Sequence, residues 1–330
     1  MLTASQAPGA TATRPYVGRF APSPTGALHA GSLVAAMASY LDARAHGGRW
    51  LVRIEDADQA RTVAGAAESM LSMLAAFGMP ADGDVVWQSR RGELYAAAFE
   101  RLQSWVYPCA CSRREIADSN GGRHASADGG LDPAALVYPG TCKSGLAPGR
   151  SARAWRVRVP ETGAPGDCIG FQDRACGWQH QTLSRQAGDF VIRRADGFWA
   201  YQLAVVVDDA AQDVTHVVRG MDLLDSTPRQ IHLQRLLGVP RLEYLHVPLV
   251  RNTQGEKLSK QTGASALDAA KPLPHLMAAA EVLGLELKAP TSVDRLWSQA
   301  VECWQQLLQV GGMTGWMEST AGRAARPDIP

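Results

Sequence analysis

A loop rich in proline and glycine near the start of the chain constrains the fold most. The run RFAPSPTGALHAGS occupies residues 19–32, after a strand predicted over 16–20 and before a helix predicted over 31–46. Two prolines restrict the loop, while Gly26 and Gly31 let a ligand approach the backbone. The first N–H groups of the helix would face that ligand, and such groups favour phosphate. This order of elements predicts a nucleotide-binding edge of a wound parallel sheet.

A second loop carries two lysines. Lys257 and Lys260 flank Leu-Ser in the run GEKLSKQTG at 255–263, and such a pair can neutralise polyphosphate charge in a transition state. Each loop alone has a plainer interpretation. The first would be a turn capped by Ser32 with His29 on the surface, and the second would be a solvated basic loop. Because both loops follow strands of one predicted sheet, together they indicate a ligand site at its carboxyl edge.

Strand-like and helix-like patterns alternate on both sides of a less regular middle, which predicts a wound α/β domain with an insertion. We expect a disordered arm at 1–15, two halves of the sheet domain at 16–106 and 201–262, an insertion at 107–200 and a helical part at 263–330. Further strands are predicted over 50–54, 84–87, 154–159, 215–219 and 242–247, and further helices over 62–77, 93–105 and 227–237.

Composition limits the class of protein. Hydrophobic residues make up 46% and charged residues 20%, which excludes a disordered or coiled-coil chain. Because 33 Lys and Arg balance 32 Asp and Glu, any nucleic-acid binding needs a local basic face. No apolar run reaches the roughly 20 residues of a membrane span, and the N-terminus lacks the pattern of an export signal. We therefore expect a cytoplasmic protein with reduced cysteines and no membrane partner.

The chain resembles class I aminoacyl-tRNA synthetases of the glutamyl and glutaminyl branch. HAGS at 29–32 resembles the His-Ile-Gly-His signature of that class, with Ser32 in place of the second histidine, and KLSK at 257–260 resembles its Lys-Met-Ser-Lys-Ser loop. Three further runs are similar to the same branch: FAPSPTGALH at 20–29, WLVRIEDAD at 50–58 and VVRGMDLLDST at 217–227.

Chain length distinguishes between families within this branch. Only 70 residues follow Lys260, where glutamyl-tRNA synthetases carry a large helical anticodon-binding part. The chain is similar to the glutamyl-Q tRNA(Asp) synthetase family over 16–261, and especially at YQLAVVVDDAAQDVTHVVRG, 201–220. That resemblance implies a Rossmann-like catalytic domain, an inserted zinc-containing acceptor-type domain and no anticodon-binding domain. It also implies that L-glutamate is activated with ATP and Mg²⁺ and esterified to queuosine in the anticodon loop of tRNA(Asp). We expect a monomer.

The resemblance also assigns roles to individual residues. It implies that Glu55 holds the glutamate ammonium, that Arg19 and Arg219 hold carboxylates, and that His29, Lys257 and Lys260 are catalytic. The full glutamate set is Arg19, Phe20, Ala21, Pro22, Ser23, Glu55, Tyr201 and Arg219, and the ATP set is Pro22, Gly26, His29, Gly31, Ser32 and Lys260. We place Arg19, Ser23, Glu55, Tyr201 and Arg219 at strand ends of one edge.

Some of these polar residues have plainer interpretations. A structural ion-pair network would also explain the arginines with Glu55, and a core position would explain Tyr201. Asp208 and Asp209 are interpreted as an acidic pair at a helix end, because no third carboxylate follows at the spacing of a metal site.

The insertion contains a candidate zinc site. Three thiolates and one further donor make a closed tetrahedral site, and such a site would stabilise a segment too polar to build a large core. The family pairs Cys-x-Cys with Tyr-x-x-x-Cys as zinc ligands, which matches Cys109, Cys111, Tyr138 and Cys142. His124, in the long loop between the pairs, is a rival fourth ligand. Inert buried thiols are the alternative.

Two other functions are compatible with parts of this pattern, and a third is excluded. A minimal glutamyl-tRNA synthetase would charge the 3′ end of tRNA(Glu), although the short C-terminal part argues against it. A glutamate-adenylating enzyme or regulatory glutamate binder would never contact RNA. An NAD-binding protein is excluded because no G-x-G-x-x-G follows the first strand.

Overall fold

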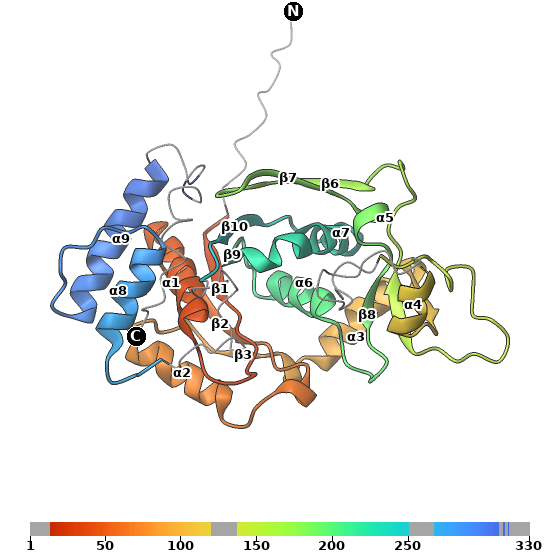
Figure 1. The fold of residues 1–330 in the computed structure, drawn as a ribbon, viewed down its shortest axis with the longest axis horizontal. Coiled ribbons are helices and arrows are strands. Elements are labelled where there is room, and N and C mark those ends of the chain that lie inside the picture. Colours follow the sequence, from red (N-terminus) through yellow and green to blue (C-terminus); the bar gives the residue numbers. More distant parts are fainter. Residues whose placement is uncertain (1–13, 120–136, 251–266, 310–312, 314–315, 317–330) are drawn as a thin grey trace, which may run out of the picture.

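The computed structural model of the 330-residue chain describes residues 14–119, 137–250, 267–309, 313 and 316 (Figure 1). The lysine loop with Lys257 and Lys260 lies outside the described residues, as do His124 and the predicted arm up to residue 13. Within the described part, no helix is both long enough and apolar enough to cross a membrane.

The centre of the molecule is a mostly parallel sheet in two sections. In the first, β1 (Val17–Phe20) pairs with β2 (Arg49–Ile54), and β2 pairs with β3 (Val86–Trp87), all in parallel. The second has the order β7-β6-β10-β9, with β6 (Cys168–Asp173), β7 (Gly177–Thr182), β9 (His216–Gly220) and β10 (Glu243–Val247). Its strands β6, β10 and β9 run parallel, and β7 is an antiparallel edge strand beside β6. The Thr215 N–H donates to the Val17 carbonyl at 2.9 Å and so joins the sections between β1 and β9. The predicted wound parallel α/β sheet is confirmed.

One core lies between the first section and the C-terminal helices. It contains α1 (Ala30–Ala45), α2 (Ala66–Ala76), α8 (Pro272–Val282) and α9 (Val293–Gln309), and Figure 1 shows α8 and α9 beside α1. The Trp297 indole donates to the Phe77 carbonyl at 2.9 Å, and the Trp304 indole donates to Asp42 at 3.0 Å. These two bonds tie the end of the described chain to its first hundred residues.

A second core surrounds α3 (Gly92–Arg101), α6 (Tyr201–Ala211) and α7 (Thr227–Leu237). The structure differs here from the prediction for Tyr201, which begins α6 and does not end a strand. All residues from Leu203 to Asp209 are buried in this helix. A helix buried on every side shows no amphipathic periodicity, so the sequence does not mark Tyr201 as the first residue of a helix.

The segment predicted as an insertion at 107–200 divides between two sheets. β4 (Val106–Cys109), β5 (Ala154–Val157) and β8 (Phe190–Arg193) form a separate antiparallel sheet, whereas β6 and β7 belong to the central one. The remaining short elements are α4 (Arg113–Ser119), α5 (Leu183–Gln186), η1 (Gln59–Arg61), η2 (Gln88–Arg90), η3 (Gln103–Trp105) and η4 (Met221–Ser226).

Candidate active site

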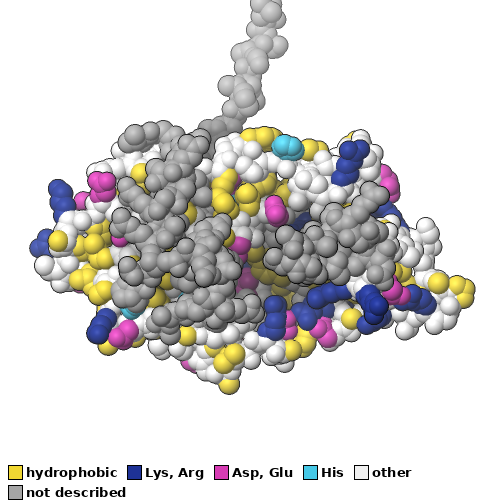
Figure 2. Space-filling model, in the orientation of Figure 1, with side chains coloured by type: hydrophobic (Ala, Val, Ile, Leu, Met, Phe, Trp, Pro, Cys, Tyr) yellow, Lys and Arg dark blue, Asp and Glu magenta, His cyan; other side chains and the backbone are white. Residues whose placement is uncertain are grey.

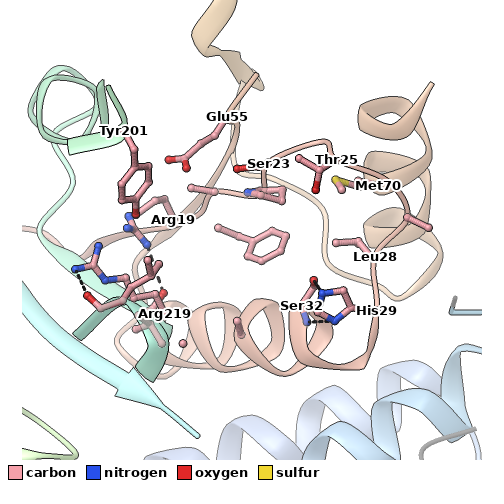
Figure 3. Close-up of a pocket in the computed structure, with 18 residues that line it drawn as sticks. Arg19, Ser23, Thr25, Leu28, His29, Ser32, Glu55, Met70, Tyr201 and Arg219 are labelled. Atoms are coloured by element: carbon pink, nitrogen blue, oxygen red, sulfur yellow. Dashed lines mark hydrogen bonds between the residues drawn. The ribbon is translucent and has the colours of Figure 1, made fainter. Parts of the chain in front are cut away.

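A cavity of about 790 Å³ opens where β1, β2 and β9 end and α1 begins (Figure 3). All eight residues predicted to bind glutamate line it, together with His29 and Ser32 of the ATP set. Gly31 lines an adjoining cavity of about 180 Å³, which shares His29 and Ser32 with the first. Gly26 lines neither cavity. The predicted glutamate and ATP residues that the structure describes are thus gathered around one carboxyl edge of the sheet, and Gly26 lies there between two lining residues, Thr25 and Ala27.

His29 caps the N-terminus of α1. Its backbone is extended, and its Nδ1 accepts from the Ser32 N–H at 3.4 Å, while the Ser32 hydroxyl lies 3.2 Å from Nε2. The first turn of α1 contains no acidic residue, so no side-chain carboxylate of that turn opposes an anion at the positive dipole end of the helix. Ser32, which stands where the class signature has its second histidine, therefore orients the ring of His29.

A buried ion-pair network forms one wall of the cavity. Arg53 is fully buried and contacts Asp209 at 2.8 Å and Glu55 at 3.3 Å, while Arg19 contacts the same Asp209 oxygen at 3.3 Å. Burial raises the pKa of Glu55 above its usual value, although Arg53 and Arg19 oppose that shift. Burial would also raise the pKa of Asp209, but the two arginines overcome it and leave the value lowered. The arginines and Glu55 thus take part in a structural ion-pair network through Asp209, and Arg19 and Glu55 also line the cavity.

Arg53 was not among the predicted site residues, although its place in the sequence indicates a buried charge. It is the one charged residue inside the apolar strand segment WLVRI, where a charge must find partners in the core. The acidic pair supplies some of them. Asp209 binds Arg53 and Arg19, whereas Asp208 accepts from Arg91 at 2.6 Å and from the Tyr95 hydroxyl at 2.8 Å. The prediction of a helix-end acidic pair is confirmed, because both residues lie in the last turn of α6.

Arg219 reaches the cavity from the end of β9. Its side chain is buried and donates to four acceptors: Gln230 at 2.8 Å, Thr227 at 2.8 Å, the Leu223 carbonyl at 3.3 Å and His246 at 3.1 Å. Figure 3 shows Arg219, Arg19 and Tyr201 at one end of the cavity, with His29 and Ser32 at the other. Burial raises the pKa of the Tyr201 hydroxyl, so this group is a neutral hydrogen-bonding partner.

The predicted zinc ligands of the insertion also lie together. The Sγ atoms of Cys109, Cys111 and Cys142 lie within 4.8 Å of one another, and the Tyr138 hydroxyl is 3.4 Å from Cys109 and 3.7 Å from Cys111. Tetrahedral zinc with Zn–S bonds of about 2.3 Å places sulfurs about 3.8 Å apart. The 3.6 Å between Cys111 and Cys142 fits that value. The four side chains therefore suit zinc.

A cation also lies beside this cysteine cluster. Arg156 donates to the Cys109 sulfur at 3.3 Å, and its guanidinium lies 3.8 Å from the centre of the Tyr138 ring. Burial disfavours the Cys109 thiolate, but hydrogen bonds from Tyr138 and Arg156 outweigh it and lower the pKa of the thiol. A thiolate is the form that binds metal.

Comparison with known protein families identifies the family of this chain. Residues 16–271 match the family described as tRNA synthetases class I (E and Q), catalytic domain, which is more than half of the chain. The chain belongs to this family. The synthetase is 61% identical to the glutamyl-Q tRNA(Asp) synthetase of Janthinobacterium sp. (strain Marseille), over 88% of its own length and 97% of the relative's. It is 59% identical to the protein of the same name from Verminephrobacter eiseniae, with the same coverage.

Solved structures agree on the fold of this synthetase. A glutamate tRNA ligase from Elizabethkingia meningosepticum, in complex with its amino acid, superposes with a TM-score of 0.69 at 24% identity. The match covers 89% of this chain and 70% of the ligase. A glutamate-tRNA synthetase from Elizabethkingia anophelis gives a TM-score of 0.70 at 23% identity, over 90% and 71% of the two chains. The class I catalytic fold is therefore shared with these enzymes.

Proposed function

We propose that this synthetase activates L-glutamate with ATP and transfers it to the queuosine base in the anticodon loop of tRNA(Asp). The observation that carries the proposal is the cavity at the end of β1, β2 and β9, where one carboxylate and two arginines face an empty volume large enough for the amino acid. The names of relatives 59–61% identical to the chain support queuosine-carrying tRNA(Asp) as the acceptor.

The charges around the cavity suit glutamate. This amino acid has one ammonium and two carboxylates, so its site needs an acid and cationic donors. Glu55 is the acid for the ammonium, because Asp209 is already shared between Arg53 and Arg19. Arg19 and Arg219 are the donors for the carboxylates, and the Tyr201 hydroxyl supplies a neutral contact. Phe20, Ala21, Pro22 and Ser23 shape the cavity between them.

Activation requires position and charge neutralisation, with no nucleophilic side chain. An oxygen of the glutamate carboxylate attacks the α-phosphorus of ATP in line, the new carboxyl–phosphate bond forms, and pyrophosphate leaves. We assign the phosphates to the α1 N-terminus and His29, with Gly26, Gly31 and Ser32 in the ATP site. Lys260, helped by Lys257, neutralises the departing pyrophosphate, and Mg²⁺ accompanies the nucleotide.

Transfer completes the reaction. A queuosine hydroxyl attacks the activated carbonyl, the ester forms, and AMP leaves. The RNA needs a basic surface, and Figure 2 shows Lys and Arg side chains gathered toward the lower right of one face, where α3 and β8 lie in Figure 1. Zinc on Cys109, Cys111, Tyr138 and Cys142 would hold the insertion in shape. A tRNA substrate places the reaction in the cytoplasm, and we expect the enzyme to act as a monomer.

Labelled glutamate tests the proposal. The purified enzyme is incubated with ATP, Mg²⁺ and one of three acceptors: tRNA(Asp) with queuosine, tRNA(Asp) without it, or tRNA(Glu). The expected result is label on the first acceptor alone. Label on tRNA(Glu) would make the protein a minimal glutamyl-tRNA synthetase, and pyrophosphate exchange without any labelled RNA would make it a non-tRNA adenylating enzyme.

A further inference from the structure

Three buried side chains form a line behind the cavity, from β6 through β10 to β9. Asp173 Oδ2 lies 2.6 Å from Nδ1 of His246, and Nε2 of His246 lies 3.1 Å from Nε of Arg219. Asp173 and His246 are fully buried, and neither lines the cavity. Of the three residues, only Arg219 faces the volume where the amino acid binds.

The partners of His246 fix its tautomer. Arginine has only donors, so Nε2 must accept the hydrogen bond from Arg219. Nδ1 therefore carries the proton and donates it to Asp173. The Thr227 hydroxyl accepts from Arg219 at 2.8 Å and can in turn donate to Nε2, which lies 3.3 Å away. A neutral imidazole in one orientation is thus required, and the Asp173 carboxylate selects it.

The line also determines what Arg219 can offer to a ligand. Arg53 pairs with Asp209 and Glu55, and Arg19 shares the same Asp209 oxygen at 3.3 Å, so the charge of Arg53 is neutralised within the protein and that of Arg19 is partly offset. Among the described residues, no carboxylate lies within ion-pair distance of Arg219, and each of its four acceptors is neutral. The guanidinium is therefore held in a fixed direction while its charge remains available for an anion in the cavity.

We propose that Asp173 and His246 are positioning residues that hold the Arg219 guanidinium toward the cavity for a carboxylate of glutamate. The inference rests on the proposed glutamate-activating function. Asp173 also accepts from the backbone N–H groups of Ala175 at 3.0 Å and Cys176 at 2.8 Å, and from that of His246 at 3.1 Å. These bonds fix the carboxylate at the turn between β6 and β7, so the sequence segment at 168–182 helps to build the site without contacting the ligand.

Two substitutions at one position separate the contacts. His246→Asn keeps a donor near Nδ1 for Asp173 but cannot reach Arg219, whereas His246→Gln places an acceptor near Nε2 and keeps the bond to Arg219. His180→Asn, at an exposed position on β7, is the matched control. Each full-length protein is assayed by glutamate-dependent ATP–pyrophosphate exchange and by calorimetric titration with L-glutamate, after a thermal melt has established folding.

His246→Asn should raise KM and Kd for L-glutamate about 10- to 100-fold, the effect of one lost hydrogen bond to a charged group, with KM for ATP and kcat nearly unchanged. His246→Gln should recover most of that loss, and His180→Asn should match the wild type. Equal defects in the Asn and Gln variants, or a loss shared by ATP and glutamate, would overturn the positioning role. If the wild-type enzyme itself fails to bind L-glutamate, the proposed function falls and takes this inference with it.

Discussion

The cavity wall and the cysteine cluster are both built from ionisable side chains, but they are stabilised differently. In the wall, Arg19 and Arg53 are balanced by Asp209 and Glu55, and these residues belong to or adjoin β1, β2 and α6, whose apolar residues form parts of two large cores. In the cluster, three thiols and a tyrosine hydroxyl face one another within a small core, of which the described part of the chain contributes six buried residues, with Arg156 as the neighbouring cation. The difference indicates that the wall can form before its ligand arrives, whereas the proposed zinc site would be complete only with its ion.

Removing Arg53 should produce the largest effect on both stability and activity. Arg53→Ala leaves Glu55 and Asp209 buried without their main cation, which costs about 3–5 kcal/mol in the free energy of unfolding. Pyrophosphate exchange should then be undetectable. Urea denaturation and the exchange assay measure the two effects. Arg49→Ala, at an exposed position on the same strand, is the control and should be close to wild type. An Arg53→Ala protein as stable as the wild type would show that the ion pairs of Arg53 do not stabilise the cavity wall.

Glu55→Gln should separate activity from folding. The amide keeps the shape of the side chain but cannot pair with an ammonium, so glutamate-dependent exchange should fall about 100-fold. The unfolding midpoint should change little, because burial already disfavours the charged form of Glu55. Glu93→Gln, on the first turn of α3, is the matched control. Unchanged exchange would remove Glu55 from the glutamate site.

The raised pKa of Glu55 predicts a smaller effect of pH. Only the ionised carboxylate holds the ammonium, so affinity for glutamate falls as the pH drops through a pKa above the usual value for glutamic acid. Asp209 has a lowered pKa and stays ionised over this range, so the wall itself is preserved. KM for glutamate should rise about tenfold per pH unit below the Glu55 pKa. The Glu55→Gln enzyme should lack this dependence, and its persistence there would assign it to another group.

Cys109→Ser should have the smallest effect on pyrophosphate exchange. The variant should lose its zinc by elemental analysis, and hydrogen exchange should quicken in β4 and β5. Exchange of pyrophosphate should stay within a few-fold of wild type, because the cluster does not line the cavity. Cys168→Ser, at an exposed cysteine outside the cluster, should keep its metal. Full metal retention in Cys109→Ser would refute the zinc site, and a complete loss of exchange would end the distinction between the two regions.

Much of the fold could be predicted because its elements are amphipathic or strongly bounded. The helix predicted over 227–237 matches α7 at both ends, since Pro228 starts it and Gly238 ends it in a left-handed conformation. The helix expected over 62–77 begins only at Ala66, after Gly65 in a left-handed conformation. Helical propensity alone does not reveal such a boundary.

The candidate site was predictable where short motifs carry the chemistry, and less so where distant strands supply it. Glu55 and Arg219 follow recognisable runs at the ends of β2 and β9. Asp173 and His246 are 73 residues apart, and only the pairing of β6 with β10 brings them together. No local pattern encodes that pairing, because the predicted insertion gave no sign that part of it joins the central sheet.

The bond from the Trp297 indole to the Phe77 carbonyl also has a consequence for biosynthesis. The two residues lie 220 positions apart, and at about 5–20 residues per second a ribosome needs roughly 10–45 s to make that stretch. During this interval α8 and α9 cannot yet cover the face of α1 that packs against them. The nascent chain therefore presents this apolar face of α1 to chaperones until the two helices emerge, and the first core closes only after that.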